Sequence, residues 1–232
     1  MKKGELRKEA IIRTAEKLFF EKGYEETSIQ DILDALSISK GGFYHYFESK
    51  NALLEEISRQ KCAANIEHIR MELFSGKMNS VQKANLLLSA IFPFGRESAE
   101  YNALTFKVSY IDGDVHFRDQ TRQFMLDALC PLLDDTISLG ISDESFFVRY
   151  PGHAGRMLLM LGYDACEEAC RMLADDAENP DIIIEMMDLL YAYREAVEVI
   201  LGAQHGSIQL FNVEQILEAI RQTADKIKLL KE

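Results

Sequence analysis

Apolar residues recur at helical spacing along nearly the whole chain of 232 residues, and no run alternates apolar and polar positions as a half-buried strand would. The first apolar stripe covers about residues 5–22 and ends at Gly23, a typical C-terminal stop. Thr27 and Gln30 have the spacing of a capping box, which predicts that a second helix opens there. A short third helix is expected at about residues 40–46.

Serines and turn residues mark the remaining helix limits. Ser39 is placed to cap the third helix, and Ser49 to cap a long fourth helix that reaches about residue 75. Glycine, proline, asparagine and aspartate interrupt the pattern further on. The later helices are expected at about residues 80–93, 97–110, 115–138, 151–175, 181–203 and 213–230. The pattern predicts an all-α protein, with an N-terminal three-helix head at residues 1–50 and a larger helical body at residues 51–232.

The segment from Ser37 to Lys50, SISKGGFYHYFESK, is unusual for its chemistry. It follows an amphipathic helix after a brief turn, which is the layout of a helix-turn-helix whose second helix enters the major groove. Phe43 and Phe47 are four residues apart and are expected to face inward. Hydroxyl, cationic and aromatic polar groups around them can donate to phosphate or reach base edges. The candidate DNA-binding residues are Thr27, Ser28, Ser39, Lys40, Gly41, Gly42, Tyr44, His45, Tyr46 and Lys50.

The net charge of −12 at first argues against nucleic acid as a partner. Residues 1–50, however, contain nine basic and nine acidic side chains, so the whole excess of negative charge belongs to the rest of the chain. The acidic body would be repelled by phosphate. We therefore expect it to stand away from DNA or to serve another purpose.

The head resembles the DNA-binding domain of the TetR/AcrR family of bacterial transcriptional regulators. The resemblance covers residues 7–54, about a fifth of the chain. Its matches include Gly23-Tyr24, Thr27-Ser28-Ile29, Ser39-Lys40-Gly41, Phe43-Tyr44-His45-Tyr46-Phe47 and Ser49-Lys50. It implies an all-helical protein of nine or ten helices, a homodimer, and a C-terminal domain that binds a small-molecule effector. The hypothesis is a repressor that binds a palindromic double-stranded operator and is released by the effector.

Three residues depart from the family pattern. Ser37 stands where the turn usually has glycine, so a positive φ there would cost about 1 kcal/mol. Gly42 replaces a threonine or serine that often donates to DNA, which removes one contact. Asn51 replaces a usual acidic residue in the first turn of the fourth helix.

The resemblance also places the dimer contact and the effector pocket in the body. Apolar stripes along residues 151–175 and 181–203 are compatible with a four-helix bundle made by two subunits, and burial within one subunit is the alternative. Aromatic and polar residues of the middle helices suit a pocket, although a packed core has the same composition. The effector-binding candidates are Phe92, Tyr101, Phe106, Tyr110, His116, Phe117, Arg122, Met125, Met160 and Tyr163.

Other kinds of protein find less support in the chain. No apolar run is long enough to span a membrane, and the N-terminus lacks the apolar stretch of a signal peptide, so a cytoplasmic location is expected. No cofactor, metal site or catalytic motif is indicated. Cys166 and Cys170 are i,i+4 neighbours, and a thiol-sensing or metal role for them stays open. The alternatives to a regulator are an all-α enzyme and a protein-binding adaptor with a relic head.

Overall fold

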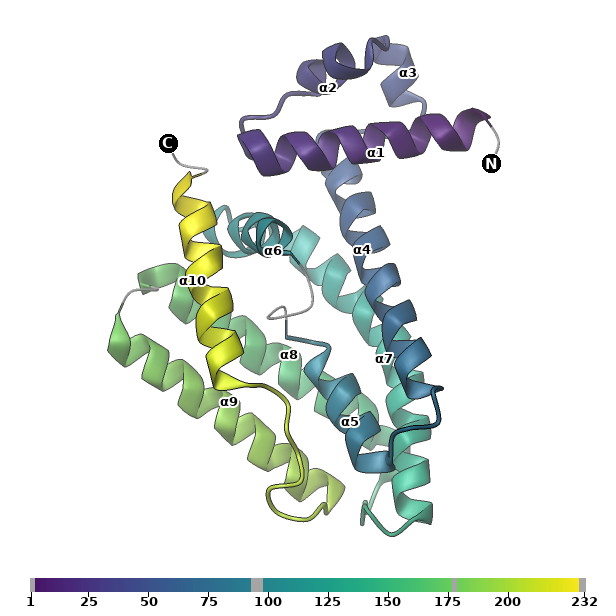
Figure 1. The fold of residues 1–232 in the computed structure, drawn as a ribbon, viewed down its shortest axis with the longest axis vertical. Helices are drawn as coiled ribbons and strands as arrows, with labels where there is room; N and C mark the ends of the chain where they lie inside the picture. The colour runs from purple at the N-terminus through teal and green to yellow at the C-terminus, as the bar shows by residue number, and fades with distance from the viewer. Residues whose placement is uncertain (1–2, 93–97, 177–178, 230–232) are drawn as a thin grey trace. The chain divides into compact units, whose positions relative to one another are not determined.

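The computed structural model describes residues 3–92, 98–176 and 179–229, and all of its regular elements are helical (Figure 1). The all-α class predicted from the sequence is therefore confirmed. A π-helical turn, Lys107–Ile111, follows the sixth α-helix. The α-helices are α1 (Lys3–Lys22), α2 (Ile29–Leu36), α3 (Lys40–Tyr44), α4 (Lys50–Leu73), α5 (Ser80–Ser89), α6 (Ala99–Phe106), α7 (Val115–Ser142), α8 (Pro151–Asp176), α9 (Pro180–Leu201) and α10 (Val213–Leu229).

Two local expectations about helix ends are wrong. The capping box of α2 consists of Ser28 and Asp31, one residue later than predicted, because the Thr27 side chain turns inward. Helix α7 continues through Gly140 to Ser142, past the end at about residue 138 that the sequence pattern predicts. The ring of Phe146 packs where a Cβ on Gly140 would stand, so this glycine permits a close approach within a helix. Pro93 and Gly95 are among the glycines and prolines expected to interrupt the helical pattern, and they lie outside the described residues.

The helices form two compact units, which we call the head unit and the body unit. Within the described residues, the head unit takes in residues 3–63, 98–121 and 222–229. It therefore contains α1 to α3, the first half of α4, α6 and the ends of two other helices. The body unit takes in residues 64–92, 122–176 and 179–221, which include α5, α8, α9 and most of α7.

One hydrophobic core holds the head unit together. Residues from α1 to α4 meet Leu104 of α6, Val108 of the π-helical turn and Phe117 of α7 in a single buried cluster. Phe19, Ile32, Phe43 and Leu53 are completely buried, and burial of apolar surface of this kind is the main stabilising force in folding. Helix α6 thus shares the core that supports α2 and α3.

The body unit is built around the antiparallel pair α8 and α9. Leu158 and Leu190 are completely buried, and the buried Tyr193 hydroxyl donates a 3.1 Å hydrogen bond to the Leu158 carbonyl. Just before the start of α8, the Phe147 N–H donates to the carbonyl of Leu201, the last residue of α9, at 2.8 Å. No described helix is long and apolar enough to cross a membrane.

Candidate DNA interface

The turn between α2 and α3 is closed by backbone hydrogen bonds around Ser37. This residue has φ 52° and ψ 45°, the left-handed conformation that its place in the turn suggested. The Ser37 N–H donates to the Asp34 carbonyl at 3.2 Å, and the Ile38 N–H donates to the Leu33 carbonyl at 3.0 Å. A left-handed serine costs about 1–2 kcal/mol relative to glycine in the same conformation. The turn is therefore formed at the expense of local strain.

Helix α3 is fixed at its start and on its inner side. The Ser39 hydroxyl accepts a hydrogen bond from the Gly42 N–H at 3.3 Å, which confirms Ser39 as the cap. Phe43 is completely buried and Phe47 is 4% exposed, with ring centroids 5.9 Å apart. The expectation that both rings face inward is confirmed. Since the inner side is anchored, the outer side of this short helix has a defined orientation.

The outer side of α3 presents polar aromatic and cationic groups. Lys40, Tyr44 and His45 are exposed, and just over half of the Tyr44 surface is accessible. The Tyr44 ring stands edge-on to Phe43, with centroids 5.5 Å apart, and His45 stands edge-on to the half-buried Tyr46 at 4.8 Å. These contacts orient the rings while the polar tips of Tyr44 and His45 stay accessible, which suits contact with a polar groove.

Thr27 does not belong to this outer side. Its side chain is completely buried, and its hydroxyl donates to the Gly23 carbonyl at 2.6 Å and lies 3.3 Å from the Leu18 carbonyl. The expectation that Thr27 faces phosphate is therefore wrong in this structure. Ser28 is exposed, but its hydroxyl is engaged in the cap of α2, where it donates to the Asp31 carboxylate at 2.6 Å. Hydrogen bonds from Lys22 and Ser28 hold the pKa of the Asp31 carboxyl well below its usual range.

Lys50 is also engaged inside the head. Its ammonium donates to the backbone carbonyls of Tyr24 at 2.6 Å and Glu25 at 3.3 Å, and only 21% of the side chain is exposed. The ammonium also lies 4.2 Å from the centre of the Tyr24 ring, a cation–π contact. Burial and nearby carboxylates, first that of Glu25, raise the pKa of the Tyr24 hydroxyl to about 12. Lys50 thus ties the start of α4 to the turn after α1.

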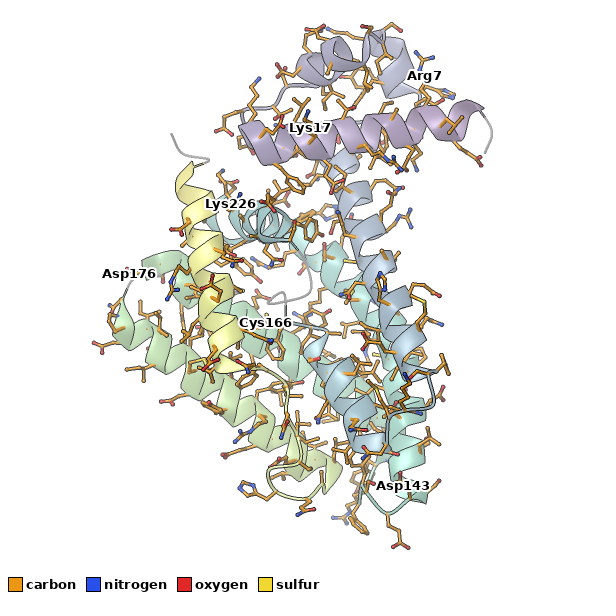
Figure 2. The ribbon with its side chains drawn as sticks, viewed as in Figure 1. Arg7, Lys17, Asp143, Cys166, Asp176 and Lys226 are labelled. Carbon is orange, nitrogen blue, oxygen red and sulfur yellow. The ribbon has the colours of Figure 1, made fainter. Side chains whose placement is uncertain are left out.

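Arg7 was not among the residues selected from the sequence. It is an exposed residue of α1 that lies beside α3 in Figure 2. One of its terminal nitrogens is 3.7 Å from the position that a Cβ on Gly42 would occupy. The sequence feature that could have identified Arg7 as part of a DNA interface is a basic side chain at a position of the first helix outside its apolar stripe. Its proximity to Gly42, 35 positions away, depends on the packing of α1 on α3.

The ten effector-binding candidates divide between the two units. Tyr101, Phe106, Tyr110, His116 and Phe117 belong to the head unit, whereas Phe92, Arg122, Met125, Met160 and Tyr163 belong to the body unit. Phe117 is part of the head core, and the Tyr101 hydroxyl donates to Ser58 at 3.0 Å. His116 is largely exposed, and Arg122 forms ion pairs with Asp164 at 3.0 Å and Glu167 at 3.7 Å. In the body unit, a pocket of about 450 Å³ is lined by residues of α5, by Phe92, by residues 209–212 and by Gln215 and Ile216.

The fold and the outer side of α3 define an all-helical protein with an N-terminal helix-turn-helix. Residues 11–57 match the model of the family described as "Bacterial regulatory proteins, tetR family". The match covers about a fifth of the chain, and within it the N-terminal domain is similar to the DNA-binding domain of that family, in agreement with the sequence motifs. The rest of the chain shares only the fold with the solved structures described next.

Individual relatives match only part of this chain. The uncharacterized HTH-type transcriptional regulator YuxN of Bacillus subtilis is 61% identical over 44 residues, which cover 19% of this chain and 15% of YuxN. The Staphylococcus aureus negative transcriptional regulator of the icaADBC biofilm operon, IcaR, is 34% identical over 87 residues, which cover 38% and 42% of the two chains. The chain thus matches less than half the length of these relatives. Reduced NemR of E. coli has a similar fold, with a TM-score of 0.52 and 21% identity, over 85% of this chain and 99% of NemR.

Proposed function

We propose that this chain is a DNA-binding transcriptional repressor that responds to a small-molecule effector. The observation that carries the proposal is the outer side of α3, where Lys40, Tyr44 and His45 are exposed on a helix anchored by Phe43 and Phe47. A helix-turn-helix reads DNA by placing such a helix in the major groove. The name of IcaR as a negative regulator supports repression as the direction of the response.

In the proposed complex, Tyr44, His45 and Lys40 reach bases and phosphates from α3, and Gly41 leaves room for the backbone to approach. Nothing stands within 4 Å of a Cβ position on Gly41, in agreement with this role. The proposed surface also includes Ser28, Ser39, Gly42 and Tyr46. Arg7 adds a cation from α1 beside Gly42.

Lys50 has a different role in this proposal from the one expected from the sequence. Its ammonium already has two carbonyl acceptors and an aromatic ring around it, so it is poorly placed to act as a free counterion for phosphate. We assign it to positioning, because it fixes the start of α4 on the turn that precedes α2. This leaves Lys40 and Arg7 as the cations beside α3 in the proposed surface.

We infer a homodimer, because a single head with so few cations beside α3 would bind DNA weakly. Two heads on a palindromic operator double the number of contacts, and the spacing of the half-sites must match the dimer. The body unit carries exposed apolar side chains on the pair that the sequence assigned to dimerisation, namely Met157 and Leu161 on α8 and Ile184 and Val199 on α9. Covering such residues with the same surface of a second copy removes apolar area from water.

The effector would act by shifting the population of dimers whose heads fit both half-sites. Binding to the form with the wrong spacing lowers DNA affinity without altering α3 itself. Such a protein works where the chromosome is, so we place it in the bacterial cytoplasm. The description of the matching family as regulatory proteins favours this reading over the enzyme and adaptor alternatives.

The test is a gel-shift titration of the purified full chain with the DNA upstream of its own gene. We expect specific retardation at low salt that is lost in Tyr44→Ala, while unrelated DNA of the same length binds weakly in both cases. A second measurement, analytical ultracentrifugation, should show a dimer that Met157→Glu weakens. If the wild-type chain retards specific and unrelated DNA alike, the proposal is wrong.

A further inference from the structure

The pocket of the body unit has walls that are firmly held. The Asn85 carboxamide of α5 donates to the Ser207 carbonyl at 3.1 Å and accepts from the Gln209 N–H at 3.1 Å. The buried Glu198 carboxylate of α9 accepts from the Ile208 N–H, also at 3.1 Å. These bonds fix the segment that connects α9 to α10 against α5 and α9. The pocket is therefore a structured cavity and not the edge of a loose loop.

Aromatic rings form part of the apolar lining of the pocket, together with Leu86, Leu210 and Ile216. Phe211 stands between Phe92, with centroids 6.0 Å apart, and Tyr191, with centroids 5.5 Å apart. Phe92 is further supported by the buried Tyr193, with centroids 6.1 Å apart. Flat rings held by edge and tilted contacts of this kind offer a preformed surface for another flat, apolar group.

The polar part of the lining consists of amide and hydroxyl groups. The lining residues are Asn85, Leu86, Ser89, Phe92, Gln209, Leu210, Phe211, Asn212, Gln215 and Ile216, and none of them has an ionisable side chain. A charged ligand that entered here would lose water without gaining an ion-pair partner from the lining, which is costly. An uncharged ligand with amide-like donors and acceptors can exchange hydrogen bonds with the carboxamides at little cost.

We propose that this pocket is the effector site and that it takes an uncharged, planar molecule with carboxamide or lactam hydrogen-bonding groups. The inference rests on the proposed function, because it names the site and chemical class of the effector. The volume of about 450 Å³ lies in the range of pockets for drug-sized ligands. Arg122 and His116, the polar members expected from the sequence, do not line this pocket.

Helix α10 has residues in both units. Gln215 and Ile216 line the pocket from the first turn of α10, which runs unbroken from Val213 to Leu229. Near its other end, within the head unit, Lys226 forms a 2.8 Å ion pair with Glu100 of α6 (Figure 2). Leu104 of the same helix α6 belongs to the core that supports α2 and α3. The first turn of α10 thus belongs to the pocket in the body unit, whereas its last turns belong to the head unit.

The experiment uses the full chain and a matched panel of probes, with naphthalene, quinoline and indole each carrying a carboxamide, a carboxylate or an aminomethyl group. Binding is read by saturation-transfer NMR and by the shift in Tm. Gln215→Trp blocks the pocket from α10, and Ser89→Phe blocks it from α5. Glu214→Trp is the matched control, because Glu214 is an exposed neighbour that does not line the pocket. Circular dichroism checks that each variant is folded.

We expect at least one carboxamide to bind the wild-type chain and the Glu214→Trp variant, with at least tenfold weaker binding of its charged counterparts. Binding should be lost in both blocked variants. The inference is overturned if a carboxylate or amine binds as well as the amide, if binding survives in the blocked variants, or if no carboxamide binds. A gel shift on the same preparation separates the two proposals: specific DNA binding without amide binding refutes only the effector site, whereas absence of specific DNA binding refutes the regulator itself.

Discussion

The Lys50 ammonium donates a 2.6 Å hydrogen bond to the Tyr24 carbonyl and lies 4.2 Å from the centre of the same residue's ring. A charged donor thus joins the first turn of α4 to the chain between α1 and α2. Hydrogen bonds to charged groups contribute about 1.5–3 kcal/mol in proteins, and the partial exposure of Lys50 places this contact at the lower end. Because of this contact, a role of Lys50 in holding α4 against the turn after α1 can be tested separately from a role of Lys50 in phosphate binding.

Lys50→Met should lower the free energy of unfolding by about 1–2 kcal/mol, because two carbonyls lose their charged donor. DNA affinity should fall, but the slope of log affinity against log salt should stay close to that of the wild type. Lys40→Met should instead leave stability within about 0.5 kcal/mol and reduce the slope by about one. Urea denaturation and salt-dependent gel shifts measure both quantities. A reduced slope in Lys50→Met would return Lys50 to the phosphate contacts.

Ser37→Gly should stabilise the protein. The left-handed conformation at φ 52° costs serine about 1–2 kcal/mol, and glycine avoids that cost. Glycine also makes the unfolded chain more flexible, which offsets about 0.4–1 kcal/mol of the gain. The expected net gain in urea denaturation lies between about 0 and 1.6 kcal/mol, with a midpoint of about 0.8 kcal/mol. Ser37→Ala provides the control and should show no gain, since alanine has the same Cβ clash. A loss of stability in Ser37→Gly would mean that the serine side chain itself contributes to the turn.

Phe43 and Tyr44 are neighbours with opposite roles. Phe43→Ala should destabilise the head by about 3–5 kcal/mol, because it leaves a cavity in a completely buried site. Tyr44→Ala should change stability by less than about 0.5 kcal/mol but weaken specific DNA binding about tenfold or more. Thermal denaturation and gel shifts on the two variants separate packing from recognition. If Tyr44→Ala binds DNA like the wild type, Tyr44 does not contact DNA.

These neighbours also show what the sequence could and could not predict. Phe43 and Phe47 were assigned to the core because their spacing of four residues places them on one face of a short helix. The sequence assigns Thr27 and Lys50 to DNA as hydrogen-bond donors. In the structure they donate to the backbone carbonyls of Gly23 and Tyr24, and no side-chain pattern in the sequence records such acceptors. Arg7 was missed for a related reason, since its position beside Gly42 arises from the packing of two helices. The ten effector-binding candidates fall in both units, and the sequence does not show which of them line a cavity, because aromatic residues are as common in a core as in a cavity.

The Glu56 carboxylate should make the free energy of unfolding depend on pH. Its carboxylate accepts from Arg59 at 2.8 Å and from Lys8 of α1 at 3.0 Å, and these partners, Arg59 first, lower the pKa of Glu56 from 4.5 to about 2. Since the native state holds the proton less tightly than the unfolded state, the stabilisation is present above pH 4.5 and is lost as pH falls toward 2.

Urea denaturation at several pH values tests this contribution. Glu56→Gln should lower stability at neutral pH and flatten the loss of stability between about pH 4.5 and 2 relative to the wild type. Glu9→Gln is a suitable control, because Glu9 pairs with Arg13 at the exposed side of α1. An acid-induced loss of stability that is equally steep in Glu56→Gln would assign the effect to other carboxylates.

Arg7 and Gly42 together predict a change in DNA sequence preference. A Cβ on Gly42 would stand 3.7 Å from an Arg7 nitrogen, and the larger side chain of threonine would extend into that space. Gly42→Thr should therefore displace the guanidinium and change the preferred base at one operator position, with little change in stability. An arginine that reads guanine contributes about 1–3 kcal/mol of discrimination, so Arg7→Ala should relax preference at the same position about tenfold or more.

Binding selection from a randomised operator library measures the preference of each variant. Arg13→Ala is the matched control, because Arg13 is an exposed arginine of the same helix that pairs with Glu9 and should leave the preference unchanged. If Arg7→Ala weakens binding to all sequences equally and lowers the salt slope by about one, Arg7 contacts phosphate only. If Gly42→Thr and Arg7→Ala change preference at different positions, the two residues act independently, and the proximity seen in the structure does not govern recognition.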